Sequence, residues 1–209
     1  MKTILCFGDS NTWGYDPSQP RRFNTNERWT MRLQSNLDAD YRIIEEGQNG
    51  RTTVFEDPFE IGKRGVDYLL PCLESHHPDL VIILLGTNDL QTRFGVTAHD
   101  IAKGAARLVQ IVQQFHHGFM HKPAEVLLVS PPPVLEVGPF KDSFVDAEEK
   151  SKQLAHYYEQ QASELGCHFL NAGDVIKTCD QEGVHWNKEE HAKLAKALAE
   201  LIPSILPAA

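Results

Sequence analysis

The chain has 209 residues, of which 41% are hydrophobic and 23% charged, a composition typical of a globular protein. We expect a single domain over residues 1–209 that is large enough to bury its own core. The net charge of −9 disfavours nucleic acid and anionic membrane surfaces as partners, and no stretch approaches the ~18 apolar residues of a membrane span.

The N-terminal apolar run ends at Phe7 and is too short for the core of a signal peptide. The four cysteines, Cys6, Cys72, Cys167 and Cys179, form no CxxC pair, and two of them fall in predicted strands. Buried free thiols are therefore favoured over disulfides or a zinc site. Together these features predict a cytoplasmic protein.

Apolar runs alternate with helical patterns along the whole chain. The runs predict strands near 3–8, 41–44, 80–85, 125–129 and 167–170, and the intervening patterns predict helices near 27–37, 62–77, 97–117, 145–165 and 188–205. Such an alternation favours right-handed crossovers and a parallel sheet. We therefore predict an α/β fold, a three-layer α/β/α sandwich around a five-stranded parallel sheet, with a flavodoxin-like architecture. Asn187, with Glu190 three residues later, predicts a capping box at the start of the last helix.

Residues suited to acyl transfer follow several of these strands. Ser10 follows the first strand, Gly50 lies beyond the second, Asn88 follows the third, and His185 comes after the fifth. The carboxyl ends of parallel strands share one edge of a sheet, so these residues can converge. Ser10 would be the nucleophile, and His185 would be its base. The backbone N–H groups of Ser10 and Gly50 and the side chain of Asn88 would form the oxyanion hole.

These segments resemble the sequence blocks of the SGNH (GDSL-type) hydrolase family. The matching features are Gly8-Asp9-Ser10, Gly50, Gly86-Thr87-Asn88-Asp89, and an acid three residues before His185, in the family's order and spacing. Two longer segments, 8–14 and 45–53, and the triplet Pro131-Pro132-Pro133 after Ser130 are similar to the bacterial arylesterase and acyltransferase branch.

The resemblance implies a serine esterase acting on short-chain acyl or aryl esters. It further implies some acyl transfer to alcohols or peroxide, and a homo-oligomer in which neighbouring subunits narrow the pocket. The small-molecule ester is the expected partner, and neither a metal nor an organic cofactor is required.

The acid of the last block departs from the family pattern. The family usually has Asp-x-x-His, whereas this chain has Glu182 three residues before His185. We favour Glu182 as the acid because it keeps the family's register. Asp180, or a backbone carbonyl in a serine–histidine dyad, remains the alternative.

Other side chains have simpler interpretations. Asp9 is expected to brace the turn that carries Ser10, and His191 is expected at the surface of the last helix. Trp13 and Trp186 stand beside proposed catalytic residues and could line the substrate pocket or belong to the core. His116, His117 and His121 have no accompanying set of carboxylates or cysteines, so a solvated helix end is favoured over a metal site.

Other classes of protein fit less well. Residues 8–12 lack the second glycine of a Gly-x-Ser-x-Gly elbow, and no G-x-G-x-x-G follows the first strand. A non-catalytic flavodoxin-like binding domain would leave Asn88 and His185 without a role. A carbohydrate O-acetylesterase is the main alternative among enzymes. The segment 16–28 shows no period and could roof the pocket or join a neighbour.

Overall fold

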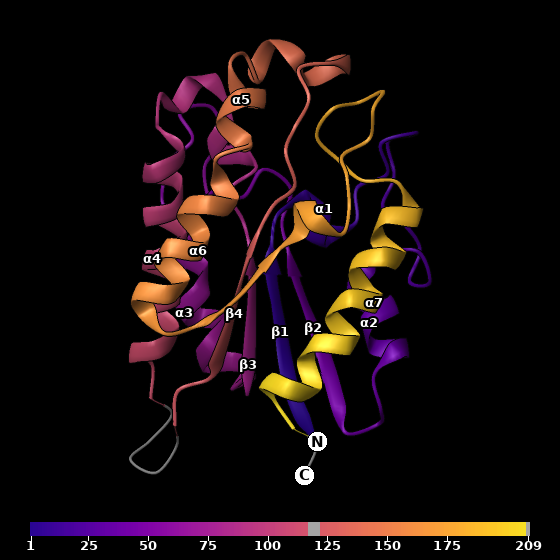
Figure 1. Ribbon diagram of the computed structural model, residues 1–209, viewed down its shortest axis with the longest axis vertical. Helices are drawn as coiled ribbons and strands as arrows, with labels where there is room; N and C mark the ends of the chain where they lie inside the picture. Colours follow the sequence, from indigo (N-terminus) through magenta and orange to yellow (C-terminus); the bar gives the residue numbers. More distant parts are fainter. Residues whose placement is uncertain (117–121, 208–209) are drawn as a thin grey trace.

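The computed structural model describes residues 1–116 and 122–207, which form a parallel sheet between two helical layers (Figure 1). The strands are β1 (Lys2–Gly8), β2 (Tyr41–Gly47), β3 (Leu80–Leu84), β4 (Glu125–Ser130) and β5 (His168–Asn171). They pair in parallel in the order β2-β1-β3-β4-β5. The predicted five-stranded α/β/α architecture is thereby confirmed.

The helices divide between the two faces of the sheet. One layer holds α3 (Gly65–His76), α4 (Ala98–Gln114) and α6 (Leu154–Leu165), and the other holds α2 (Trp29–Asn36) and α7 (Lys188–Ile205) (Figure 1). Two shorter helices, α1 (Ser10–Trp13) and α5 (Ala147–Ser151), lie at the carboxyl edge of the sheet. Within the described residues, four segments form 3-10 helices. Three are single turns, η1 (Asn88–Leu90), η2 (Thr92–Phe94) and η4 (Ala172–Asp174), and the fourth, η3 (Gly138–Ser143), is longer.

Alternation along the strands builds a separate core on each face. In β1, Leu5 and Phe7 pack with the α3, α4 and α6 layer, whereas Ile4 and Cys6 pack with α2 and α7. Successive side chains of a strand point to opposite faces, so a strand covered on both sides must be apolar throughout. This explains the uninterrupted apolar runs in the sequence.

Two elements differ from their predicted limits. β2 continues through Glu45 and Glu46, which are tolerated because it is an edge strand: Arg28 pairs with Glu45 at 2.6 Å, and His76 contacts Glu46 at 3.0 Å. The single helix expected over 145–165 is broken between α5 and α6. At that break the Ser151 hydroxyl donates to the Glu148 carbonyl, a local bond of the kind that competes with the helical ladder.

The predicted capping box at the start of α7 is wrong. Asn187 is the N-cap residue, but its side chain makes no capping hydrogen bond, and Glu190 instead accepts from the backbone N–H of Lys177 at 2.9 Å. A capping box is present at α4, between Thr97 and Asp100.

All four cysteines are free, as predicted. Cys6 and Cys179 are buried, whereas Cys72 and Cys167 are only half-buried, and Cys167 lies one residue before β5. Burial raises the pKa of Cys6 well above its usual value and the pKa values of Cys72 and Cys167 to about 11.

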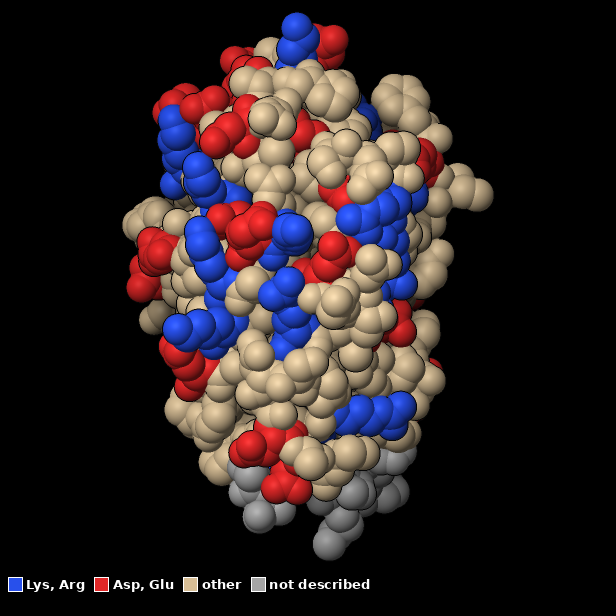
Figure 2. Space-filling view, turned by 90° about the vertical axis from the view of Figure 1, so that its right-hand side faces the viewer, with Lys and Arg blue, Asp and Glu red and all other residues tan. Residues whose placement is uncertain are grey.

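None of the helices within the described residues is long and apolar enough to cross a membrane. Figure 2 shows the face that carries α2 and α7, where basic and acidic side chains are interspersed. Ion pairs at α2 and α7 include Arg28 with Glu45 and Lys193 with Glu190.

The segment 16–28 is held against the body of the molecule. Asp16 is buried and accepts from Ser18 and from Arg21, whose guanidinium lies 2.9 Å away. Phe23 is also buried, with its ring edge-on to His191 at 5.1 Å. No residue of the segment 16–28 lines the pocket described below, but Tyr15, which precedes the segment, does.

The expectation that His191 lies at the surface is wrong. Its side chain is fully buried between Phe23 and Trp186, and its Nδ1 accepts from the backbone N–H of Trp29 at 3.1 Å. Burial, reinforced by the positive charge of Arg32, lowers the pKa of His191 to about 3. The sequence misled because the α7 face carrying His191 packs on α2, so this histidine is neutral in the folded protein.

Acid should therefore destabilise the protein through His191. Below pH 6.5 the unfolded chain binds a proton at this position that the folded state rejects, so stability falls as pH drops from about 6.5 toward 3. Between pH 7 and pH 5 this costs about 2 kcal/mol of unfolding free energy. His191→Asn keeps an acceptor for Trp29 without titrating, and urea unfolding should show that much less acid sensitivity than wild type. Exposed His99→Asn is the control, and equal acid sensitivity in all three proteins would contradict the assignment.

Candidate active site

The predicted residues meet where the order of the strands reverses direction. β1 and β3 are neighbours in the sheet, but α2, which follows β1, and α4, which follows β3, lie on opposite faces. Ser10 follows β1 and Asn88 follows β3, so the two flank this switch point at the carboxyl edge of the sheet. Crevices at such points are the usual ligand sites of open parallel sheets.

A short helix directs Ser10 into this crevice. Asp9, not Ser10, caps α1: its carboxylate accepts from the backbone N–H of Asn11 at 2.9 Å, which is the bracing role predicted for it. Gly47 allows this helix to sit directly on β2, because a Cβ there would lie 2.2 Å from the backbone nitrogen of Trp13. The hydroxyl of Ser10 is therefore free for another partner.

That partner is His185. Its Nε2 lies 2.8 Å from Ser10 Oγ, and its Nδ1 lies 2.5 Å from Glu182 Oε1. All three side chains are buried. Residues 175 positions apart thus form one continuous chain of hydrogen bonds, Ser10–His185–Glu182.

Glu182 also organises the loop that carries His185. Its second oxygen, Oε2, accepts from the backbone N–H groups of Val184 at 2.9 Å and His185 at 2.7 Å. Burial alone would raise the pKa of Glu182, but the hydrogen bond and charge interaction with His185, together with these backbone donors, hold it below the usual value. The carboxylate is therefore ionised and fixed in place.

Asp180 does not approach His185. Its side chain is 71% exposed and pairs with Lys177 at 3.2 Å. The contact expected of the acid is made by Glu182.

Three N–H donors predicted for the oxyanion hole border the same pocket. Gly50 has φ +77°, a conformation that a side chain would strain, and Asn88 Nδ2 donates one hydrogen to the carbonyl of Arg51 at 3.0 Å. The backbone N–H groups of Ser10 and Gly50 have no hydrogen-bond partner within residues 1–116 and 122–207. These groups are available to a bound oxygen atom.

The pocket they border has a volume of about 310 Å³. Tyr15 stacks on the His185 ring at 4.2 Å and Phe140 meets it edge-on at 5.6 Å, so two aromatic rings enclose the imidazole. The pocket is lined by Ser10, Tyr15, Asn49, Gly50, Glu60, Asn88, Gln91, Arg93, Phe140, Ser143, Phe144, Val184 and His185.

Neither predicted tryptophan lines this pocket. Trp186 is 1% exposed and packs in the core under α7, because the residue after His185 faces away from the crevice. Trp13 lies at the end of α1 with the guanidinium of Arg22 over its ring at 5.3 Å. The aromatic wall is instead formed by Tyr15, Phe140 and Phe144.

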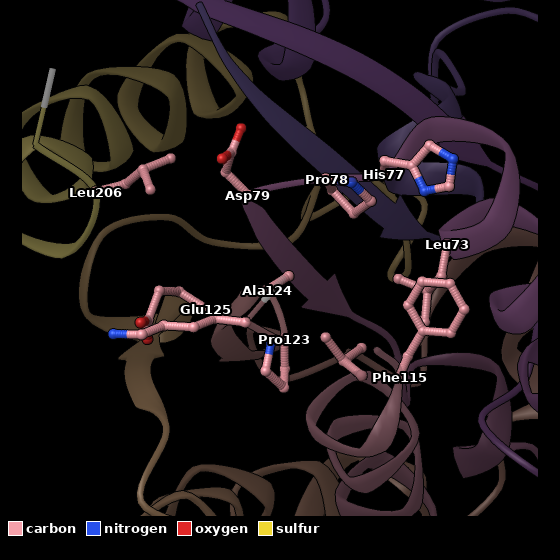
Figure 3. Close-up of a pocket in the computed structure, with 11 residues that line it drawn as sticks. Leu73, His77, Pro78, Asp79, Phe115, Pro123, Ala124, Glu125 and Leu206 are labelled. Atoms are coloured by element: carbon pink, nitrogen blue, oxygen red, sulfur yellow. The ribbon is translucent and has the colours of Figure 1, made fainter. Parts of the chain in front are cut away.

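A second cavity of about 280 Å³ lies at the opposite, amino-terminal edge of the sheet (Figure 3). Asp79, Glu125, Phe115 and Leu206 border it, and none of its described lining residues carries a hydroxyl or thiol. It contains none of the residues predicted for acyl transfer.

Comparisons with known proteins identify the family of the chain. The model of the GDSL-like Lipase/Acylhydrolase family matches residues 6–193. An aryl esterase from M. smegmatis is 41% identical, with 99% of this chain and 100% of that chain covered and a TM-score of 0.94. The chain is an esterase of the SGNH (GDSL-type) hydrolase family.

Other solved structures are also similar to this SGNH hydrolase. A carbohydrate acetylesterase from Sinorhizobium meliloti is 38% identical, with 99% of this chain and 100% of that chain covered and a TM-score of 0.94. A lipase/acylhydrolase from Enterococcus faecalis shares the fold at 17% identity, with 100% and 99% covered and a TM-score of 0.72. No curated protein matches the chain.

The sequence did not reveal how this hydrolase joins its Gly50 and Asn88 loops. Buried Asp89 accepts from the backbone N–H of Thr53 at 2.9 Å and from the Thr53 hydroxyl. Burial raises the pKa of Asp89 to about 6 despite these bonds, and burial likewise raises that of Asp9 to about 6. The contact joins the segment after β2 to the segment after β3. In the sequence, this contact is indicated by Thr52-Thr53 after Arg51 and by Asp89 at the end of the Gly86-Thr87-Asn88-Asp89 block.

No group of three or more metal-binding side chains occurs in the part of the chain that the structure describes. Of the histidine cluster near residue 116, His117 and His121 lie outside the described residues.

Removing the Thr53 hydroxyl should destabilise the SGNH fold at this junction. Thr53→Val is close in shape but leaves the buried Asp89 carboxylate with one donor fewer, which should cost about 1–3 kcal/mol of unfolding free energy. Urea denaturation measures the loss. Thr92→Val is the matched control, because the Thr92 hydroxyl is exposed, and it should change stability by less than about 0.5 kcal/mol. Equal losses in the two variants would contradict a role for this contact.

Proposed function

We propose that this SGNH hydrolase is a serine esterase that cleaves short-chain acyl or aryl esters through an acyl-enzyme. The observation that carries the proposal is the Ser10–His185–Glu182 hydrogen-bonded chain, whose serine end opens into a pocket bordered by three N–H donors. In this proposal the whole chain, residues 1–209, is one catalytic domain.

In the first half-reaction His185 Nε2 takes the proton of Ser10 Oγ as that oxygen attacks the ester carbonyl carbon. Glu182 holds the imidazole in the tautomer whose Nε2 can accept, and its carboxylate stabilises the imidazolium that forms. The carbonyl oxygen becomes negatively charged and is bound by the backbone N–H groups of Ser10 and Gly50 and by Asn88 Nδ2. His185 then returns the proton to the departing alcohol.

In the second half-reaction an acceptor attacks the acyl-enzyme. His185 removes a proton from water as the water oxygen attacks the acyl carbon, and the same donors stabilise the second oxyanion. His185 then returns the proton to Ser10 Oγ as the bond between Ser10 and the acyl group breaks and the carboxylic acid is released. An alcohol or hydrogen peroxide in place of water would give a new ester or a peracid. Every step uses side chains and backbone groups of the chain itself.

The dimensions of the pocket favour small acyl groups. Its volume of about 310 Å³ is at the low end for small-molecule sites, and Tyr15, Phe140 and Phe144 supply aromatic surface. An aryl or short acyl group fits such a space better than a long alkyl chain. The 41% identity to an aryl esterase supports this choice.

A carbohydrate O-acetylesterase is the second candidate. The side chains of Asn49, Glu60, Gln91 and Arg93 give the pocket wall a polar portion that could bind sugar hydroxyls. The similarity to a carbohydrate acetylesterase at 38% identity supports this alternative. The same residues would perform the chemistry on either substrate.

A homo-oligomer is also part of the proposal. Phe59 and Ile61 are 79% and 93% exposed, and they flank the pocket residue Glu60. Apolar side chains so exposed beside a polar rim are typical of surfaces that another protein covers.

Rates on p-nitrophenyl esters of increasing acyl length and on acetylated sugars should separate the two candidate functions. Wild-type protein should hydrolyse p-nitrophenyl acetate, with kcat/KM falling steeply toward p-nitrophenyl octanoate, because the longer chains exceed the pocket. Ser10→Ala should lose nearly all turnover and keep its thermal unfolding midpoint. Activity on acetylated sugars far above that on aryl acetates would favour the second candidate. Intact activity in Ser10→Ala would sink the mechanism, and a folded wild type inactive on every ester would point to a binding domain.

The two acids near His185 should respond very differently to neutralisation. Glu182→Gln cannot satisfy His185 Nδ1 and the backbone N–H groups of Val184 and His185 together, since one end of an amide is a donor. We expect kcat to fall about 10²- to 10⁴-fold, as for a misoriented imidazole. Asp180→Asn is the matched control and should leave kcat within about twofold. The reverse ranking would assign the acid to Asp180, and two unchanged rates would indicate a serine–histidine dyad.

A further inference from the structure

A line of polar side chains behind the Asn88 amide is not used by the mechanism above. It runs from Asp57 through Arg93 and Gln91 to Asn88, and it joins the loop after β2 to η1 and η2. Asp57, Gln91 and Asn88 are buried, and the Arg93 side chain is 23% exposed.

Each link of this line has a defined donor. Arg93 Nη2 donates to Asp57 Oδ2 at 2.6 Å, and Arg93 Nη1 donates to Gln91 Oε1. Gln91 Nε2 then donates to Asn88 Oδ1 at 3.2 Å. The guanidinium thus donates in both directions, and on its Gln91 side each hydrogen bond is donated toward Asn88.

The guanidinium decides the orientation of both amides. Arg93 has no acceptor, so only the oxygen of Gln91 can face it, and the nitrogen of Gln91 must face Asn88. Asn88 in turn presents its oxygen to Gln91 and its nitrogen to the Arg51 carbonyl at 3.0 Å and to the pocket. If Asn88 were reversed, its oxygen would face the substrate carbonyl and oppose the developing negative charge.

Asp57 fixes the far end of the line. Its Oδ1 accepts from the backbone N–H groups of Phe59 at 2.9 Å and Glu60 at 3.3 Å, which leaves Oδ2 for Arg93. Burial would raise the pKa of Asp57, but these donors and Arg93 lower it, so the carboxylate stays ionised. Arg93 is thereby held by a partner that cannot move freely.

We infer that Gln91, held by Arg93 and Asp57, is a positioning residue that orients the Asn88 amide toward the oxyanion. This inference rests on the proposed function, since it requires that Asn88 bind the oxyanion. The arrangement also polarises Asn88: hydrogen bonds in a chain strengthen one another, and the chain begins at a cation. Gln91 would act through Asn88 without donating to the oxyanion itself.

The test is a double-mutant cycle between Gln91 and Asn88. Gln91→Glu keeps size and the contact with Arg93, but it presents an acceptor to Asn88 Oδ1. We expect kcat on p-nitrophenyl acetate to fall about tenfold or more, with KM changed by less than about threefold. This loss of kcat should not exceed the loss of about 10²- to 10³-fold that we expect for Asn88→Ala. In the Asn88→Ala background Gln91→Glu should change kcat by less than about twofold, because its target is gone.

Arg93→Lys provides a second test that does not alter Gln91. A lysine can bond to Asp57 or to Gln91 but cannot hold both as a fork does, so kcat should fall in wild type and not in Asn88→Ala. Gln113→Glu is the control for replacing a hydrogen-bonded glutamine by glutamate outside the site. Gln113 lies near the end of α4 and donates to the Leu165 carbonyl, so this variant should leave kcat unchanged.

The outcomes separate this inference from the proposed function. Equal losses of kcat in both backgrounds, or a rise in KM without a fall in kcat, would overturn the inference and make Gln91 a substrate contact or a purely structural residue. Activity that survives Ser10→Ala, or Asn88→Ala without effect, would overturn the proposed function instead.

Discussion

The active site, at the carboxyl edge of the sheet, depends on the buried carboxylate of Glu182. It accepts from the imidazole of His185 with one oxygen and from two backbone N–H groups of the same loop with the other. The anion that orients the histidine thus also sets the conformation of the loop that supplies it. Burial alone would raise the pKa of Glu182, so these donors are what keep its ionised form favoured.

The remaining parts of the site are held by the same kind of interaction. Asp9 caps the helix that presents Ser10, Asp89 joins the Gly50 and Asn88 loops through Thr53, and Asp57 anchors Arg93. Each carboxylate is buried, and each accepts backbone or guanidinium donors. The strands bring the loops to one edge, and these acids then fix the loops relative to one another.

The sequence predicted the centre of the sheet well because its strands are covered on both faces and are nearly continuous in apolar residues, as β3 is. It failed where tertiary contacts decide: β2 extends through charged residues paired by Arg28 and His76, and His191 is buried by packing of α7 on α2. Within the site, local motifs located Ser10, Asn88, Glu182 and His185. Tyr15 and Phe140 were missed as pocket residues because they meet His185 only in the fold. The Asp57–Arg93–Gln91 line was missed because Asp57, which anchors Arg93, lies on a different loop.

The central claim is that Ser10 is a nucleophile activated by His185. Incubation with diethyl p-nitrophenyl phosphate, followed by intact-mass and peptide mass spectrometry, tests it directly. The account predicts one diethyl phosphoryl group per chain, located on Ser10, with esterase activity lost in proportion and no adduct on His185→Ala over the same time. Complete inactivation with Ser10 unmodified, or an adduct that forms equally fast without His185, would contradict it.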